Sequence, residues 1–183
     1  MCDTIFKRLN YTNSASFVTF LLPFGRMIDF TRRQELTASE KIDVRELWNN
    51  EYPEQLRLTD MSKLEEYLAG LAFAEHLLVY TKDGTVAAWA VKFIRNEERS
   101  FVIIVASSLH RTGIGKQLLN VLKMGETQLT GWAVDHQRYL KSNQQTYLSP
   151  LPFYLMNSFS IAEASRLELP TLSAVKIIWK SRW

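Results

Sequence analysis

The stretch from Phe101 to Leu119 restricts the fold more than any other part of the sequence, because it joins three local patterns without a break. Five apolar residues, Phe101 to Val105, predict a buried strand. A polar loop with two glycines, Gly113 and Gly115, comes next. An amphipathic helix is predicted from there to Lys123, with an inward face made by Ile114, Leu118, Leu119, Val121 and Leu122. A strand that leads through a glycine turn into a helix is typical of α/β proteins, whose helices cover a sheet.

The glycine turn also has the chemistry of an anion site. The N–H groups of a helix's first turn have no partner inside the helix, and the helix dipole places partial positive charge there. Two well-known phosphate motifs do not fit the spacing. A Walker A loop would need glycine at His110 and serine or threonine at Gln117, and the dinucleotide fingerprint would need glycine at Leu118. The sequence leaves open a third kind of phosphate turn, or a tight connection that binds nothing.

Turn and cap signals predict the other elements. Thr37-Ala-Ser-Glu40 and Ser62-Lys-Leu-Glu65 have the form of capping boxes, which start helices; the first helix ends before Pro53 and the second reaches Ala72. Ser149-Pro150 predicts the N-cap and first residue of a helix through Asn157. The predicted strands are Ile28–Arg32, Leu77–Tyr80, Thr85–Ile94, Phe101–Val105, Trp132–Val134, Ile161–Leu167 and Ala174–Lys180. Residues 1–26 predict an extension that adds one strand, Phe17–Leu22.

Composition excludes several classes of protein. A chain of 183 residues with 46% hydrophobic residues is long and apolar enough for one compact domain. Its formal net charge of +3 is too small for a nucleic-acid partner. The single cysteine, Cys2, excludes an internal disulfide, and no histidine cluster suggests a metal site. The longest apolar run, Phe17–Phe24, is too short to span a membrane. Because a lone cysteine suits a reducing compartment, we expect a cytoplasmic protein.

Two segments resemble the GNAT superfamily of N-acetyltransferases. His110-Arg-Thr-Gly-Ile-Gly115 is similar to that family's motif Gln/Arg-x-x-Gly-x-Gly/Ala, with histidine at the first position. The segment from Phe153 to Phe159 is similar to the family's downstream pattern Phe/Leu-Tyr-x-x-x-Gly-Phe, with Ser158 in place of glycine and Asn157 available for a left-handed cap. The resemblance runs from Met27 to Trp183. It implies an α/β (α+β) domain over 27–183, with a central mixed, mostly antiparallel sheet of about six or seven strands flanked by about four helices.

The resemblance also implies a donor site for acetyl-CoA without a metal. The strands Phe101–Val105 and Trp132–Val134 are expected to run parallel and diverge, with the pantetheine arm between them on the backbone of Val105 and Ser107. The pyrophosphate is expected on the turn made by His110, Arg111, Thr112, Gly113, Ile114, Gly115 and Lys116. In this interpretation the protein transfers an acetyl group to a primary amine by direct attack in a ternary complex.

For catalysis, the resemblance implies that Tyr154 is the general acid that protonates the leaving thiolate. Asp135 and His136, beside the cleft, are the candidate bases. The predicted wall of the acceptor site contains Trp48, Glu51 and Tyr52. Between Glu35 and Glu66, nine acidic residues stand against four basic ones, a net charge of −5 that favours a cationic amine such as a polyamine or aminosugar, or a protein amine.

Two other functions remain open from the sequence. Because His110 and Ser158 depart from the family pattern, the chain also fits a GNAT-fold module that binds or senses acyl-CoA without efficient catalysis. The other alternative is a small α/β domain whose glycine turn binds no nucleotide. The sequence also leaves open whether the C-terminal strands form a homodimer.

Overall fold

The computed structural model describes residues 11–12, 15–21 and 27–181. Its strands are β1 (Tyr11–Thr12), β2 (Ala15–Leu21), β3 (Met27–Arg33), β4 (Ala72–Tyr80), β5 (Val86–Arg95), β6 (Glu98–Val105), β7 (Gln128–Ala133), β8 (Ser160–Leu169) and β9 (Leu172–Lys180). Its α-helices are α1 (Ala38–Glu51), α2 (Met61–Ala69), α3 (Ile114–Lys123) and α4 (Leu151–Met156). Short 3-10 turns lie at Glu54–Leu56 and Ser107–Leu109.

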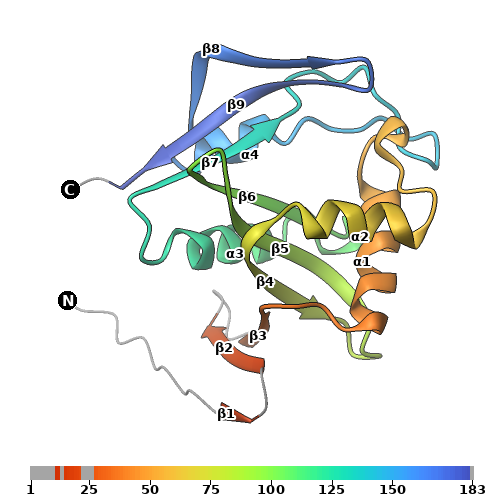
Figure 1. Cartoon of the computed structure of the whole chain (residues 1–183), viewed down its shortest axis with the longest axis vertical. Helices are drawn as coiled ribbons and strands as arrows, with labels where there is room; N and C mark the ends of the chain where they lie inside the picture. The colour runs from red at the N-terminus through yellow and green to blue at the C-terminus, as the bar shows by residue number, and fades with distance from the viewer. Residues whose placement is uncertain (1–10, 13–14, 22–26, 182–183) are drawn as a thin grey trace.

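The strands form one sheet in the order β1-β2-β3-β4-β5-β6-β7-β9-β8 (Figure 1). All pairs of neighbouring strands are antiparallel except β6 and β7, which run parallel. The predicted mixed, mostly antiparallel sheet with four helices is therefore confirmed. Strands β3 to β9 supply the seven strands expected, and β1 and β2 extend the sheet beyond them.

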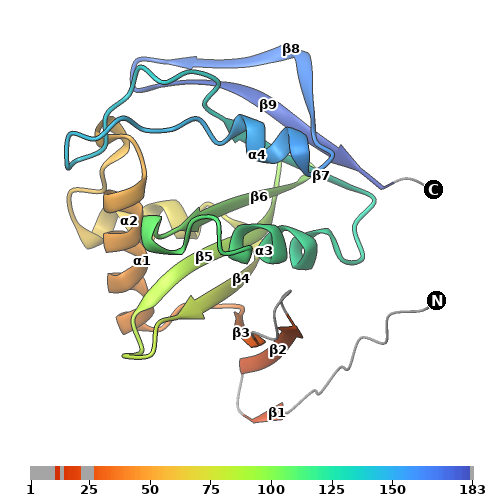
Figure 2. The same ribbon diagram turned by 180° about the vertical axis from the view of Figure 1, so that it is seen from behind.

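Helices cover both faces of the sheet. Figure 1 shows α1 and α2 in front of the central strands, and Figure 2 shows α3 and α4 on the opposite face. Side chains of a strand alternate between faces, so Val102 and Ile104 of β6 join the core under α1 and α2. Phe101 joins the core under α3, together with Leu118 and Tyr154. Strand β6 thus borders both halves of the core, which places its end beside both groups of helices.

The first helix starts as predicted and the second does not. Thr37 Oγ1 accepts the N–H of Glu40, and the Glu40 carboxylate accepts the N–H of Thr37 in return, so the first capping box is confirmed. The second box is wrong, because Asp60 Oδ1 accepts the N–H of Lys63 at 3.1 Å and caps α2 in place of Ser62. That helix ends at Gly70, so Ala72 belongs to β4.

The last helix is also displaced from its prediction. Its N-cap is Pro150, and Ser149 Oγ still accepts the N–H of Leu151 at 3.2 Å. After the helix, Ser158 itself adopts the left-handed conformation, with φ of 67°. Asn157 has φ of −103° and does not take that role. A serine therefore occupies the conformation for which the family pattern has glycine.

The N-terminal part of the chain adds to the sheet next to β3. Strand β2 pairs antiparallel with β3 from Ser16 opposite Arg32 to Leu21 opposite Met27, and β1 pairs with β2. The predicted strand, Phe17–Leu22, overlaps β2, and Leu22 lies outside the described residues. The division into an extension over 1–26 and a domain over 27–183 stays a prediction.

Strand β7 begins four residues before the predicted start at Trp132 and includes Gly131. This glycine is explained by close packing: a Cβ atom there would lie 3.0 Å from Cε1 and 3.2 Å from Cζ of Phe101. The Phe101 ring packs edge-on against Tyr154, with ring centroids 5.7 Å apart. Strand β7 therefore needs a residue without a side chain where it passes this ring.

We expect Gly131→Ala to lower the free energy of unfolding by about 1–3 kcal/mol, the usual cost of overpacking a tight core. Thermal and denaturant unfolding would measure the change. Gly125→Ala is a comparison variant in which the added Cβ meets nothing within 4 Å. Because Gly125 has φ of +76°, any loss of stability in that variant comes from backbone strain and not from packing. A loss at Gly131 no larger than about 0.5 kcal/mol would contradict the packing argument.

Candidate active site

The candidate site lies where β6 and β7 separate. These two strands share a single paired position, Ser100 opposite Thr130, although β6 continues to Val105. Strand β7 then continues alongside β9, from Gln128 opposite Lys180 to Ala133 opposite Val175. The two strands run parallel and diverge, as predicted, which leaves part of the β6 edge without a neighbouring strand.

The backbone groups on that edge can be assigned from one hydrogen bond. Ala106 donates its N–H to the carbonyl of Ala87, so this residue faces β5. Because alternate residues of a strand direct their amides to opposite edges, Ile103 and Val105 direct theirs into the opening. An extended ligand could pair with these groups as an added strand would.

Two side chains already contact the backbone groups predicted to hold the pantetheine arm. His110 donates from Nε2 to the carbonyl of Val105 at 3.0 Å. Glu51 Oε1 accepts the N–H of Ser107 at 2.7 Å. The Val105 N–H and the groups of Ile103 are the remaining candidates on this edge, so the donor would have to share the edge with these side chains or displace them.

The turn before α3 directs backbone N–H groups toward one place. Arg111 and Gly113 both have positive φ, 62° and 93°, and Gly113 is the N-cap of α3. Left-handed residues in such a turn form a concave nest of N–H groups that suits an anion. The first N–H groups of α3, beginning at Ile114, add to it. Lys116 is exposed and supplies positive charge, and Ile114 contributes only backbone because its side chain is buried.

Thr112 has a structural contact in this turn. Its hydroxyl donates to the carbonyl of Leu109 at 2.6 Å and so holds the loop closed. Gly115 lies against the Phe153 ring, where an added Cβ would come within 3.5 Å of Cζ. The residues predicted from 110 to 116 therefore lie together around one turn.

A cavity of about 680 Å³ leads from this turn to the aromatic core. Its outer end is lined by the turn residues Arg111, Gly113, Gly115 and Lys116, and its inner end by Tyr154. Val105, the last residue of β6, also lines it. The N–H nest, the positive side chains and the free strand edge fit acetyl-CoA, whose pyrophosphate and extended amide arm need these groups.

A second cavity of about 290 Å³ meets the first at the opening between the strands. Four residues line both cavities: Tyr52, Ile103, Tyr147 and Tyr154. Tyr147 and Tyr154 are each only 8% exposed. Within the described part of the chain, the hydroxyl groups of the three tyrosines form no hydrogen bond to protein. These hydroxyls are not among the buried polar atoms that lack a partner, so the oxygen atoms are open to the cavity and can hydrogen-bond to a polar group from outside the chain.

Burial determines the protonation of these phenols. It raises the pKa of Tyr52, Tyr147 and Tyr154 above the ordinary value of a tyrosine, and neighbouring tyrosines raise it further at Tyr52 and Tyr154. Glu51 adds to the rise at Tyr147. All three therefore keep their O–H proton at neutral pH and can donate a hydrogen bond at the junction.

A buried ion pair connects the two sides of the opening. Glu51, the last residue of α1, accepts hydrogen bonds from Lys141 Nζ at 2.5 Å and from the hydroxyl of Ser107 at 2.7 Å. Lys141 also lies 3.0 Å from Ser107 Oγ. Glu51 and Lys141 line the first cavity. Sequence reasoning did not find Lys141, because a single lysine in a long loop has no pattern that distinguishes it.

The other predicted acceptor residues lie on the cavity walls. Trp48 lines the second cavity and donates its indole N–H to the carbonyl of Leu56 at 2.8 Å. Tyr52 packs edge-on against Trp48, with centroids 4.7 Å apart. The end of α1 thus brings Trp48, Glu51 and Tyr52 to the two cavities.

Asp135 and His136 line neither cavity. Asp135 accepts two hydrogen bonds from Arg166, at 2.7 and 3.2 Å, and this contact holds its pKa below the ordinary value. The His136 ring packs against Tyr139 at 4.5 Å, and its Nε2 is buried without a hydrogen-bond partner. The structure therefore does not bring the two candidate bases to the junction with Tyr154.

Among the described residues, no group of three or more His, Cys, Asp or Glu side chains could hold a metal ion. No helix in the described ranges is long and apolar enough to cross a membrane.

The sequence matches no protein-family model and no curated protein. Solved structures do share its fold. A GNAT-family acetyltransferase from Staphylococcus aureus has a TM-score of 0.59 at 16% identity, over 82% of this chain and 98% of that chain. The ribosomal-protein-S18-alanine N-acetyltransferase from Escherichia coli has a TM-score of 0.55 at 18% identity, over 82% of this chain and 93% of that chain.

A third similar structure contains the expected donor. It is a GNAT-superfamily phosphinothricin acetyltransferase from Sinorhizobium meliloti in complex with acetyl-CoA, with a TM-score of 0.55 at 12% identity over 82% of this chain and 88% of that chain. At these identities the similarity establishes the fold. The chain has the GNAT fold of N-acetyltransferases, as its two motifs predicted.

Proposed function

We propose that this protein is an acetyl-CoA-dependent N-acetyltransferase that transfers the acetyl group directly to a primary amine in a ternary complex. The junction of the two cavities is the observation that carries the proposal. Tyr154 lines both cavities, and burial raises the pKa of its phenol, which supports a role where a donor from the α3 turn would meet an acceptor from the other face of the sheet. The similarity of the fold to acetyltransferases supports the same assignment.

In this proposal the chain binds the donor through backbone. The N–H groups from Arg111 to Lys116 hold the pyrophosphate, with charge-assisted contacts from those two side chains. The amide arm pairs with the Val105 carbonyl and the Ser107 N–H, where it displaces His110 and Glu51. Acetyl-CoA supplies an activated thioester, and the Val105 N–H stabilises negative charge on its carbonyl oxygen during attack.

The transfer balances with groups at the junction and water. The ammonium form of the acceptor first gives one proton to water, and the nitrogen of the neutral amine then bonds to the acetyl carbon. That nitrogen releases a second proton to solvent as the carbon–sulfur bond breaks, which leaves an amide. Tyr154 gives its phenol proton to the departing thiolate and regains one from solvent. Asp135 and His136 are not needed as bases in this scheme.

A second function is favoured by a specific observation. His110 and Glu51 occupy the Val105 carbonyl and the Ser107 N–H, two groups that the family pattern assigns to the donor. An acyl-CoA sensor could use binding of the donor to displace these side chains and move α1 or the 107–110 turn. Such a module would bind acetyl-CoA without rapid transfer.

Calorimetric titration with acetyl-CoA and with CoA, followed by a thiol-release assay with a panel of amines, tests the proposal. We expect binding of both nucleotides and amine-dependent release of thiol. Binding without thiol release from any amine would support the sensor, and no binding would rule out both functions.

A further inference from the structure

The acidic segment between Glu35 and Glu66 predicts negative charge around the acceptor. The wall of the second cavity has a different character. Aromatic rings make up much of it, among them Trp48, Tyr67, Phe93 and Trp132. Arg95 is the only charged residue among those that line it. Its volume of about 290 Å³ suits a small molecule rather than a long polymer. A compact, flat and apolar body would fill this space best.

Arg95 places a positive charge beside this wall. It ends β5, and its guanidinium carbon lies 5.0 Å from the centre of the Phe93 ring. No ion pair found among the described residues includes Arg95. Burial raises the pKa of Tyr67 to about 12, and the Arg95 charge opposes that rise, so the charge acts on the cavity wall.

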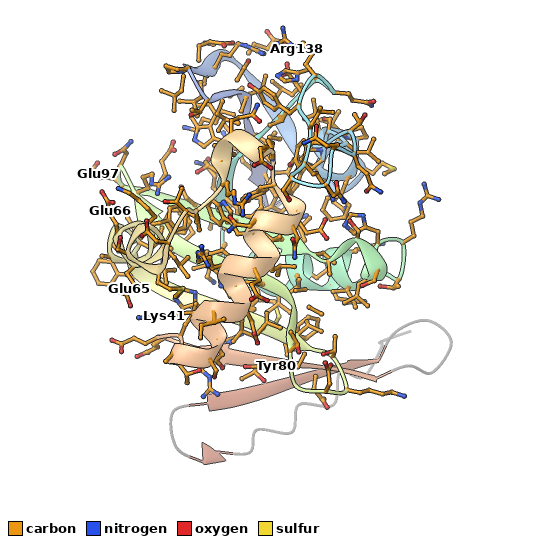
Figure 3. The ribbon with its side chains drawn as sticks, turned by 90° about the vertical axis from the view of Figure 1, so that its right-hand side faces the viewer. Lys41, Glu65, Glu66, Tyr80, Glu97 and Arg138 are labelled. Atoms are coloured by element: carbon orange, nitrogen blue, oxygen red, sulfur yellow. The ribbon has the colours of Figure 1, made fainter. Side chains whose placement is uncertain are left out.

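The acidic segment between Glu35 and Glu66 does not supply a matching negative charge. Of its nine acidic residues, only Glu51 lines either cavity, and Lys141 already pairs with it. Glu65 and Glu66 lie on the outer side of α2, where Glu65 pairs with Lys41 at 3.1 Å (Figure 3). A polyamine in the second cavity would therefore face Arg95 without a free carboxylate.

The strand register gives the distance from the Phe93 ring, which lies beside the Arg95 guanidinium, to Ile103 at the junction. Phe93, under the guanidinium, pairs with Ser100, and Ile103 at the junction lies three residues further along β6. Three residues of a strand span about 10 Å. An acceptor that reaches both ends must carry its amine and its anionic group at opposite ends, which an α-amino acid does not.

From these observations, and resting on the proposed function, we infer that the second cavity binds a primary amine with a flat apolar body and an anionic group at its far end. The amine lies at the junction with Tyr154, the body lies among the aromatic rings, and the anionic group pairs with Arg95.

Three probes with the same ring test this class: para-(aminomethyl)benzoate, para-methylbenzylamine and para-xylylenediamine, which differ only in carrying a negative, neutral or positive group opposite the amine. A charge-assisted pair predicts that the benzoate has a kcat/KM at least about 10-fold above the neutral amine, mostly through KM. The diamine is expected to be the poorest. Thiol release measures all three.

Arg95→Gln should remove the advantage of the benzoate and leave the neutral amine within about 2-fold, because only the pairing with the anionic group is lost. Arg138→Gln is the matched control, since Arg138 is exposed and lines neither cavity. Its ranking of the probes should equal that of the wild type.

Equal or better use of the diamine, or an unchanged ranking in Arg95→Gln, would overturn the inference. So would acetyl-CoA binding without thiol release from any of the three probes. Absence of acetyl-CoA binding in calorimetry would instead overturn the proposed function on which the inference rests.

Discussion

Replacing Gly113 with tryptophan should abolish measurable binding of acetyl-CoA and CoA. The indole would fill the concave turn at the start of α3, where Gly113 is the N-cap with φ of 93°. Loss of two charge-assisted hydrogen bonds to the pyrophosphate, at about 1.5 kcal/mol each, predicts binding at least about 100-fold weaker. Calorimetric titration measures the dissociation constants directly.

Backbone strain has to be separated from blockage of the site. Gly84→Trp is the matched control, because Gly84 also has positive φ, +87°, in the β4–β5 turn and has nothing within 4 Å of an added Cβ. It should fold less stably but bind acetyl-CoA as the wild type does. Lys116→Glu gives a second test on an exposed helix position, with binding at least about 10-fold weaker expected from charge repulsion. Wild-type affinity in both site variants would place the donor elsewhere.

The fold and the glycine turn before α3 were predictable because local patterns determine them. Five apolar residues and two glycines were enough to predict β6, the turn and α3, and the capping box at Thr37 correctly predicted the start of α1. Boundaries were less certain. Asp60 caps α2 by accepting the N–H of Lys63, and Ser62 donates its hydroxyl to the same carboxylate at 2.5 Å, so the N-cap lies two residues before the predicted one. Aspartate and serine are similarly good N-caps, so the sequence does not rank the two candidates.

Only the part of the second cavity that the end of α1 supplies, at Trp48 and Tyr52, was predicted, because contacts between distant segments create the rest. The partner of Glu51 is Lys141, 90 residues away, and the cavity near Arg95 combines residues from α1, α2, α4 and five strands.

The expectation of a cationic amine, drawn from the acidic segment, stays a prediction, and the lining of the second cavity does not add to its support. The sequence shows how many carboxylates the segment contains, but not which of them are free to bind a ligand. Several already cap helices or form ion pairs, such as Glu40 with Arg33.

In this scheme, the divergence of β6 and β7 separates the donor site from the acceptor site. A parallel pair that diverges exposes strand backbone, and backbone suits the extended amide arm of the donor. The acceptor cavity, on the other face of the sheet, is lined by side chains. Side chains differ between proteins that share one fold. We therefore expect variants of the α3 turn to alter use of all amines alike, whereas variants such as Arg95→Gln alter the choice among amines.

Tyr154→Phe should lower kcat by about 100-fold or more, the usual contribution of a positioned general acid, and leave the dissociation constant of CoA within about 3-fold. The phenol proton is lost, but the ring that packs against Phe101 and Phe159 is kept. Pre-steady-state and steady-state thiol release measure the change in turnover. A sensor would show no change in any measurable rate.

Tyr147→Phe tests which phenol at the junction acts, because Tyr147 lines the same two cavities with its own buried O–H. We expect it to keep kcat within about 10-fold, below the contribution of a general acid. A large loss in Tyr147→Phe together with normal turnover in Tyr154→Phe would transfer the role to Tyr147.

The pH profile adds a readout that a purely structural role would not give. Burial raises the pKa of Tyr154, so the acid stays protonated as pH increases, whereas the acceptor amine becomes the reactive neutral form. The wild-type rate should therefore rise with pH and show no decline up to about pH 10, where an ordinary phenol is half ionised. A decline in the wild-type rate below pH 9 that is absent in Tyr154→Phe would mean that the Tyr154 phenol loses its proton in this pH range. That result would contradict the argument that burial keeps the phenol protonated.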